Sequence, residues 1–183
     1  MNKYFYITSA LLALFLLFAI NKSLHAKEKL PELKTVQQVD INKYLGLWYE
    51  IARYHAWFEK NCTGVTALYS LKPNGKIEVI NSCFKKSLSG KRKTAKGTAW
   101  VTDISTNAKL KVRFFWPFAG DYWIIELDND YKYAVVGCPK RDYLWILCRE
   151  PRMDEVLYGE LLKKIAEKGY DITRIHRTLQ PVR

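Results

Sequence analysis

Residues 109–114 read Lys-Leu-Lys-Val-Arg-Phe, a stretch in which charged and apolar side chains alternate without a break. Successive side chains of a β-strand point to opposite faces, so Leu110, Val112 and Phe114 share one face of such a strand. Strict alternation of this kind predicts a strand with one face in an apolar interior and the other in water. The fold is therefore expected to contain a sheet with one buried side.

Seven further runs rich in Val, Ile, Tyr, Phe and Trp surround this stretch, and turn-forming residues such as Pro73-Asn74-Gly75 separate them. The eight runs cover residues 46–54, 64–71, 76–84, 97–103, 109–116, 121–127, 132–138 and 143–149. Near-regular spacing predicts an antiparallel sheet, and short connections favour a meander that closes to remove its exposed edges. We predict an all-β fold, an eight-stranded antiparallel up-and-down barrel.

A different pattern follows the eighth run. Residues 152–168 lack proline and a β-branched run, and Gly169 is suited to a left-handed helix cap. Apolar residues recur there at helical spacing, at Met153, Val156, Leu157, Leu161 and Ile165. The run at 121–127 is apolar on both faces, so we expect one C-terminal α-helix packed outside the barrel there. Residues 172–176 are expected to add an outer strand.

The N-terminal segment differs from the rest of the chain. Lys3 opens a short positive region, and Tyr4–Ile20 is apolar apart from Thr8 and Ser9. This order matches a secretory signal peptide with a cleavage site at Leu24-His25-Ala26. The alternative is an uncleaved anchor, because the apolar run is just long enough to span a bilayer. We expect a signal peptide at residues 1–26 and one domain at 27–183.

The chain has a formal net charge of +12 at pH 7. Six cations and no acidic residue fall between positions 85 and 96, namely Lys85, Lys86, Lys91, Arg92, Lys93 and Lys96. Such a surface attracts anionic lipid headgroups or nucleic acid by long-range electrostatics. An exported location argues against nucleic acid, so contact with an anionic membrane surface is the expected alternative to a merely solvated loop.

Three short motifs resemble those of the lipocalin family. Gly46-Leu47-Trp48-Tyr49 resembles the Gly-x-Trp signature of the first strand, and residues 128–133 resemble the turn signature between strands six and seven. Asn129 stands where the family usually has Thr. In that family the Trp lies inside the closed end of the barrel, with a cation packed near it. The resemblance implies structural roles for Gly46, Trp48, Asp130, Tyr131 and Arg149.

Further stretches of the chain resemble one branch of this family, the bacterial lipocalins, which are related to apolipoprotein D. Residues 44–53, 114–118 and 141–147 resemble that branch, and coverage runs from about Val39 to Pro181. The resemblance implies a non-catalytic carrier of fatty acids or lysophospholipids, without a cofactor or metal, in the cell envelope. No Cys follows the apolar N-terminal run. We therefore expect a periplasmic or released form, able to associate with the outer membrane without an N-terminal lipid anchor; a homodimer is left open.

The expected ligand site combines inward strand positions with aromatic residues of the first loop. Trp48 sets the inward face of its strand, so alternation places Glu50, Ala52 and Tyr54 on the same face. Glu50 is expected to pair with a cation or a Tyr hydroxyl, or else to have a raised pKa. The predicted ligand-binding residues are Tyr54, Trp57, Phe58, Ala67, Tyr69, Val79, Asn81, Leu110, Val112, Phe114, Tyr122, Ile124 and Trp145. The resemblance implies that the loop with Trp57 and Phe58 is a lid. The alternative is that these side chains simply fill the barrel.

All four cysteines lie in the part expected to be exported, where disulfides persist. The turn at residues 73–75 places Cys83 across from about residue 65, so we predict a Cys62–Cys83 disulfide. Cys138 and Cys148 end adjacent antiparallel strands at opposite barrel ends, and we expect both to be free, buried thiols. An enzyme acting through a cavity thiol, Cys62 or Cys138, is the alternative function; no catalytic pair is visible beside either, so no enzyme is expected.

Overall fold

The alternating stretch forms strand β5 (Lys109–Arg113) in the computed structural model, which describes residues 30–181. The predicted signal peptide at residues 1–26 lies outside the described residues. Residues 32–181 form the unit described below. Among residues 30–181, no helix combines the length and the hydropathy needed to cross a membrane.

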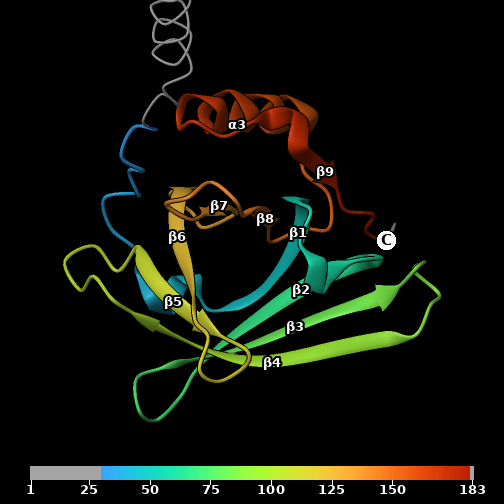
Figure 1. The fold of residues 1–183 in the computed structure, drawn as a ribbon, viewed down its shortest axis with the longest axis horizontal. Helices are drawn as coiled ribbons and strands as arrows, with labels where there is room; N and C mark the ends of the chain where they lie inside the picture. The colour runs from blue at the N-terminus through green and yellow to red at the C-terminus, as the bar shows by residue number, and fades with distance from the viewer. Residues whose placement is uncertain (1–29, 182–183) are drawn as a thin grey trace, which may run out of the picture. The chain divides into compact units, whose positions relative to one another are not determined.

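Eight antiparallel strands close into one barrel (Figure 1). They are β1 (Gly46–Tyr54), β2 (Cys62–Leu71), β3 (Ile77–Lys85), β4 (Arg92–Val101), β5, β6 (Gly120–Leu127), β7 (Tyr133–Gly137) and β8 (Leu144–Cys148). Each strand pairs with the next in the chain, and β1 also pairs with β8, so the sheet has no free edge between first and last strand. The predicted up-and-down barrel is confirmed.

Two strand boundaries differ from the prediction by three residues or more. β4 begins at Arg92 rather than at residue 97, because β3 pairs with it up to the contact of Phe84 with Arg92. The cations at 92–96 therefore lie on a strand and not in a loop. β5 ends at Arg113, so Phe114 already belongs to the bend that follows. As a result β4 extends past the end of its partner β5.

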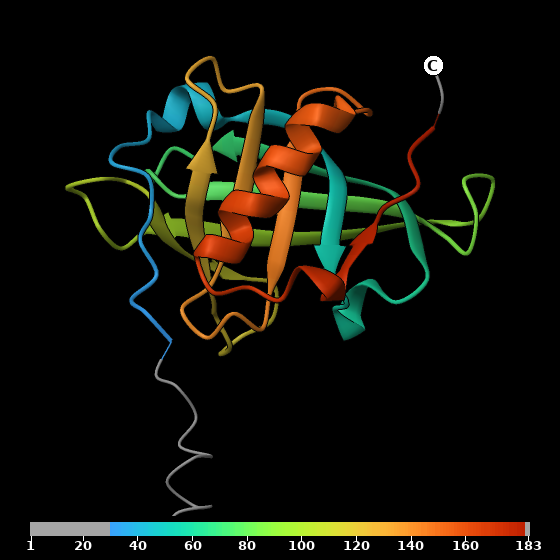
Figure 2. The same cartoon turned by 90° about the horizontal axis from the view of Figure 1, so that it is seen from above.

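The two ends of the barrel are built differently. At the closed end the short helix α2 (Ile41–Tyr44) precedes β1, and the backbone N–H of Val39 donates to the carbonyl of Thr106. The loops after β1, β3, β5 and β7 all lie at the opposite end, which we call the mouth (Figure 2). The first mouth loop contains the short helix η1 (Trp57–Glu59).

Helix α3 (Glu155–Glu167) covers the outer wall of the barrel over β6, β7, β8 and β1 (Figures 1 and 2). The Asp154 carboxylate caps it by accepting from the N–H groups of residues 156 and 157, and Gly169 ends it at φ +82°. Its buried face consists of Tyr158, Leu161 and Ile165. The prediction for Val156 was wrong: this side chain is exposed, because the cap turns it toward solvent and Tyr158 inward.

The chain ends by completing the barrel wall. Helix η2 (Ile172–Arg174) leads into β9 (Ile175–Arg177), which pairs with the last residues of β1 as the predicted outer strand. β1 pairs with β2 only over Gly46–Tyr49, and the C-terminal tail (Thr178–Gln180) fills the seam beyond. The N–H of Thr178 donates to the Ile51 carbonyl, and the N–H of Gly64 donates to the Leu179 carbonyl.

Candidate functional site

A β-bulge in β1 decides which of its side chains face the interior. The pairing of β1 with β8 shifts between Glu50 and Ala52, and such a bulge reverses the alternation beyond it. Trp48 lies in the inner core, whereas Ala52 and Tyr54 lie in the cluster beneath α3. The simple alternation used in the sequence analysis therefore fails after the bulge.

Tyr54 was wrongly predicted to bind the ligand. Its hydroxyl donates to the Asp171 carbonyl at 2.9 Å, and its ring lies 5.8 Å from that of Tyr170. The Arg174 guanidinium stacks on the ring at 4.5 Å. Tyr54 thus joins the barrel to the segment after α3, on the outside.

The other strand residues predicted for the ligand site mostly come together inside the barrel. A fully buried group surrounds Trp48 toward the closed end, and it includes Tyr69, Val79, Leu110 and Ile124. A second group packs against it and is only partly buried: Ala67, Val112, Phe114, Tyr122 and Trp145. Gly97 of β4 permits this packing, because a Cβ there would come within 2.8 Å of the Phe114 ring.

The degree of burial changes along the barrel axis. Val112, Phe114, Tyr122 and Trp145 lie on the mouth halves of β5, β6 and β8 or just beyond, and each keeps surface that solvent reaches. The strand residues around Trp48, such as Ile77, Ala99 and Leu147, have almost none. Part of the apolar inner surface is therefore accessible on the side of the mouth.

Three tyrosine hydroxyls form a polar group within this apolar interior. The hydroxyl of Tyr122 lies 2.7 Å from that of Tyr44 and 2.9 Å from that of Tyr69. Burial raises the pKa of Tyr69 to about 12, so all three remain neutral at physiological pH. Asn81 on β3 adds a buried Oδ1 without a hydrogen-bond partner among the described residues. The interior can therefore hydrogen-bond a polar group of a ligand, which the sequence pattern did not indicate.

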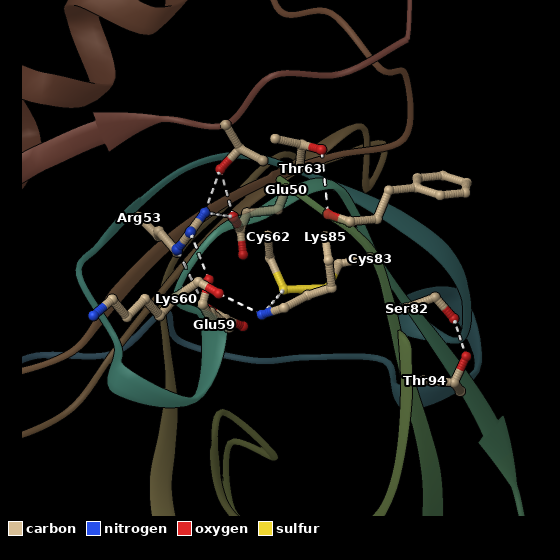
Figure 3. The surroundings of a disulfide bond; sticks show 12 residues. Glu50, Arg53, Glu59, Lys60, Cys62, Thr63, Ser82, Cys83, Lys85 and Thr94 are labelled. Carbon is tan, nitrogen blue, oxygen red and sulfur yellow. Dashed lines mark hydrogen bonds and ion pairs between the residues drawn. A yellow bond between two sulfur atoms is a disulfide. The ribbon is translucent and has the colours of Figure 1, made fainter. Parts of the chain in front are cut away.

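A cluster of three charged side chains joins the first mouth loop to β1 (Figure 3). The Arg53 guanidinium donates to Glu50 Oε1 at 2.6 Å, and its Nε lies 3.3 Å from Glu59 Oε2. Thr178 of the C-terminal tail donates to the same Glu50 oxygen and accepts from Arg53 at 2.9 Å. All four side chains are buried. The expected pairing of Glu50 is present, and burial also raises its pKa.

Glu59 connects this cluster to the barrel interior. Its carboxylate accepts a hydrogen bond from Trp145 Nε1 at 3.3 Å. Burial, reinforced by the nearby Glu50 carboxylate, raises the pKa of Glu59 to about 8, and Arg53 only partly opposes this shift. A proton on Glu59 therefore exchanges within the physiological range. No periodicity or motif in the sequence pointed to this residue.

The predicted lid residues lie at the rim of the mouth. The rings of Trp57 and Phe58 are 5.6 Å apart, and Phe58 lies 6.0 Å from Tyr143, which stacks on Trp145 at 5.7 Å. Four aromatic rings thus lead from the rim to the inner wall. Trp57 points outward, with 79% of its surface exposed. Glu59 of the same short helix is buried, and its hydrogen bond from Trp145 attaches the loop to the barrel wall.

The cysteines lie as predicted. A disulfide joins Cys62 and Cys83 at the mouth, with Lys85 Nζ 4.0 Å from Cys62 Sγ (Figure 3). Cys138 and Cys148 are free and buried, and burial raises the pKa of both thiols. The Cys138 thiol donates to Asp142 at 2.8 Å.

The signature residues hold the closed end together. The Arg149 guanidinium stacks 3.8 Å from the centre of the Trp48 ring and donates to the carbonyls of Lys43, Leu45 and Leu47. Gly46 adopts φ +93° and lies so close to Arg149 that a Cβ would come within 3.3 Å of it. These contacts give Gly46, Trp48 and Arg149 structural roles at the closed end.

The turn between β6 and β7 contains Asn129, the position that departs from the family's usual Thr. Asp128, rather than residue 129, accepts hydrogen bonds from the backbone N–H groups of Asp130 and Lys132. Tyr131 adopts φ +61°, and its hydroxyl accepts from the N–H of Asp40. The departure at Asn129 therefore leaves the turn capped.

Two hollows lie on the outer surface. One of about 510 Å³ is bounded by Gln38–Asn42, Asn107 and Tyr131 at the closed end. The other, of about 350 Å³, lies between the start of α3 and the ends of β7 and β8. Neither includes a predicted ligand-binding residue. The barrel interior and its mouth are thus the region that gathers the candidate residues.

Comparisons with known proteins agree with this geometry. The profile of the lipocalin-like domain matches residues 39–180. Temperature-induced lipocalin-1 of Arabidopsis thaliana is 40% identical over 158 residues, covering 81% of this chain and 83% of that protein. Outer membrane lipoprotein Blc of Escherichia coli is 41% identical over 146 residues, covering 80% and 82%. The solved structure of insecticyanin from Manduca sexta, 18% identical, superposes with a TM-score of 0.66 over 82% of this chain and 85% of that one, a likeness of fold.

Proposed function

Since this chain belongs to the lipocalin family, a family of proteins that bind small hydrophobic ligands, we propose that it carries or stores a lysophospholipid or fatty acid in the cell envelope. The observation that carries the proposal is the gradient of burial along the barrel. Phe114, Tyr122 and Trp145 offer an apolar surface that is partly accessible near the mouth, next to the buried residues around Trp48. A ligand with one long apolar part fits such a surface better than a polar metabolite does.

The acyl chain is proposed to lie between Trp145, Phe114, Tyr69 and Ile124. Each methylene that leaves water contributes about 0.8 kcal/mol, so a chain of ordinary length supplies the affinity without any polar contact. The headgroup remains at the mouth, among the residues of the first mouth loop, where polar groups orient it.

The cellular place of the protein is proposed from the N-terminal sequence and from its relatives. Residues 1–26 read as a signal peptide, and one relative is named an outer membrane lipoprotein. We propose export to the periplasm or envelope, with residues 27–183 as the functional domain. The cations at 85–96 support contact with anionic membrane surfaces as part of this role.

The alternative of a thiol-dependent enzyme loses its chemical basis. Cys62 is held in a disulfide, so it has no thiol to act as a nucleophile. Burial raises the pKa of Cys138, and its nearest polar partner is the Asp142 carboxylate rather than a cation or histidine. A reactive cysteine requires the opposite environment, one that stabilises the thiolate.

A pair of neighbouring substitutions tests the proposed site. Phe114→Asp places a carboxylate on the inner face, and we expect it to weaken lysophospholipid binding by about 100-fold, because the charge must be desolvated beside the acyl chain. Phe115→Asp is the matched control, since Phe115 is 72% exposed, and it should bind like the wild type. Circular dichroism checks that both variants fold.

The proposal fails if a folded Phe114→Asp variant binds lysophospholipid with unchanged affinity in a fluorescence titration. Native mass spectrometry of protein purified from its own envelope extends the test. It should show a bound species with the mass of a lysophospholipid or fatty acid, and it gives the number of subunits in the same spectrum.

A further inference from the structure

The loop between β5 and β6 exposes three large aromatic side chains within four residues. Phe115 is 72% exposed, Trp116 81% and Phe118 78%. Phe114, directly before them, turns inward onto Gly97. The loop therefore divides its aromatic residues between the barrel interior and the solvent. A contiguous exposed group of this kind marks a surface that meets an apolar partner.

This exposed group lies at the mouth. β5 runs toward the mouth and β6 runs away from it, so their connecting loop stands on the same rim as η1 and the loop between β7 and β8 (Figure 2). η1 contributes Trp57, a fourth aromatic residue that is 79% exposed. Two of the mouth loops thus present aromatic side chains to solvent, next to the accessible part of the inner surface.

Uncompensated positive charge accompanies the aromatic loop. β4 continues past the end of β5, so residues 92–96 and the preceding turn form a hairpin that projects from the barrel on the mouth side (Figure 2). Lys86, Lys91 and Lys93 are exposed, and no ion pair joins any of them to an acidic residue within residues 30–181. Only Lys96 of this segment is neutralised, by Glu78 at 2.9 Å. The rim therefore attracts a negatively charged surface.

Aromatic side chains and lysines together match one kind of partner. Trp, Tyr and Phe settle at the boundary between lipid headgroups and acyl chains, and Lys and Arg bind the anionic phosphates above it. A protein partner for the same patch would need acidic residues around an apolar centre, and a second copy of this chain presents the same positive rim. Charge complementarity thus favours an anionic bilayer.

We propose that the β5–β6 loop inserts Phe115, Trp116 and Phe118 into the headgroup region of an anionic membrane, with the lysines of the β3–β4 hairpin bound to its phosphates. The mouth then faces the bilayer, and a lysolipid passes between leaflet and barrel without crossing bulk water. This inference rests on the proposed carrier function for its purpose, but docking is measured independently of ligand binding.

Flotation with vesicles tests the docking surface. We compare the wild type with the triple variant Phe115→Ser/Trp116→Ser/Phe118→Ser, on vesicles of phosphatidylcholine with and without phosphatidylglycerol. The matched control is Ile104→Ser, because Ile104 is equally exposed, at 89%, but lies in the β4–β5 loop at the closed end. We expect binding to the anionic vesicles to fall about tenfold in the triple variant and to stay unchanged in the control.

Three further readouts decide the outcome. Adding anionic vesicles should shift the tryptophan emission of the wild type to the blue, and Trp116→Phe should reduce that shift. Lysolipid affinity in the absence of vesicles should be retained by the triple variant. The proposal is overturned if the triple variant floats like the wild type, if it loses lysolipid affinity together with vesicle binding, or if sedimentation shows that the substitutions abolish a dimer instead.

Discussion

Glu59 accepts a hydrogen bond from the indole nitrogen of Trp145 at 3.3 Å, and this contact joins the first mouth loop to the inner wall of the barrel. The same carboxylate faces Arg53 and lies near Glu50, which Arg53 already neutralises at 2.6 Å. Two carboxylates thus share one buried guanidinium. The protonation of Glu59 therefore affects both the first mouth loop and the inner wall at Trp145.

The stability of the wild type should fall as the pH rises from about 5 to about 9. The pKa of Glu59 is raised to about 8 in the folded state, so the folded protein holds a proton that the unfolded chain has released. The stability linked to this proton is complete below the ordinary pKa of a glutamate and is lost as the pH passes through 8. Glu59→Gln removes this titration.

Thermal unfolding at a series of pH values measures the effect. The glutamine variant should lose less stability than the wild type over this range, by about 1 kcal/mol or more. The stability of the glutamine variant should still fall somewhat as the pH rises, because burial also raises the pKa of Glu50. Glu167→Gln, on the exposed side of α3, is a suitable control. Parallel curves for Glu59→Gln and the wild type would contradict the assignment.

Tyr54→Phe separates the outer cluster from the ligand site. The substitution removes the hydrogen bond to the Asp171 carbonyl and should cost about 1 kcal/mol of unfolding free energy. Lysolipid affinity should not change, because Tyr54 packs beneath the segment that follows α3 and not inside the barrel. Urea unfolding and a ligand titration on the same variant measure both quantities. Weaker binding at unchanged stability would place Tyr54 back on the inner face.

Replacing Arg149 by lysine should destabilise the protein, although the positive charge is retained. Arg149→Lys keeps the charge, but a lysine cannot reach the separate carbonyls of Lys43, Leu45 and Leu47 or stack flat on Trp48. We expect a loss of about 2–3 kcal/mol in urea unfolding. Lys132→Arg, at an exposed position near the same end, should have little effect. A fully stable Arg149→Lys protein would show that charge alone is enough.

The disulfide should stabilise the mouth side of the barrel. It closes a loop with a sequence separation of 21 residues, and the joint replacement of Cys62 and Cys83 by serine should cost about 3 kcal/mol. Replacing the buried Cys138 alone breaks no covalent link and should have a smaller effect. Unfolding with and without a reducing agent provides the comparison. Insensitivity of the wild type to reduction would contradict the expected contribution.

Much of the fold could be predicted because its signals are periodic. The alternation at residues 109–114 and the helical spacing before Gly169 each depend on local geometry, and both elements are present. The Cys62–Cys83 pair followed from the register of one hairpin. These features need only neighbouring residues, or residues joined by a short turn.

The features that escaped prediction depend on residues far apart in the chain. The β1 bulge, which turns Tyr54 outward, shows only in the pairing with β8. Glu59 acquires its raised pKa from Glu50 and from burial by other strands, and no run of residues around it carries a sign of this. Val156 fits the helical stripe by spacing, yet the cap at Asp154 leaves it in solvent.

The barrel wall includes the last described residues of its own chain. Thr178 bonds to Ile51, and Gln180 bonds to the carbonyls of Glu50 and Val65 across the seam. Since these partners are separated by more than a hundred positions, the seam cannot close until the residues of the C-terminal tail have been synthesised. A chain without Thr178–Gln180 would lack the residues that fill the seam beside Glu50 and Arg53. Water would then reach these buried charged side chains, and the barrel wall there would be open to proteolysis.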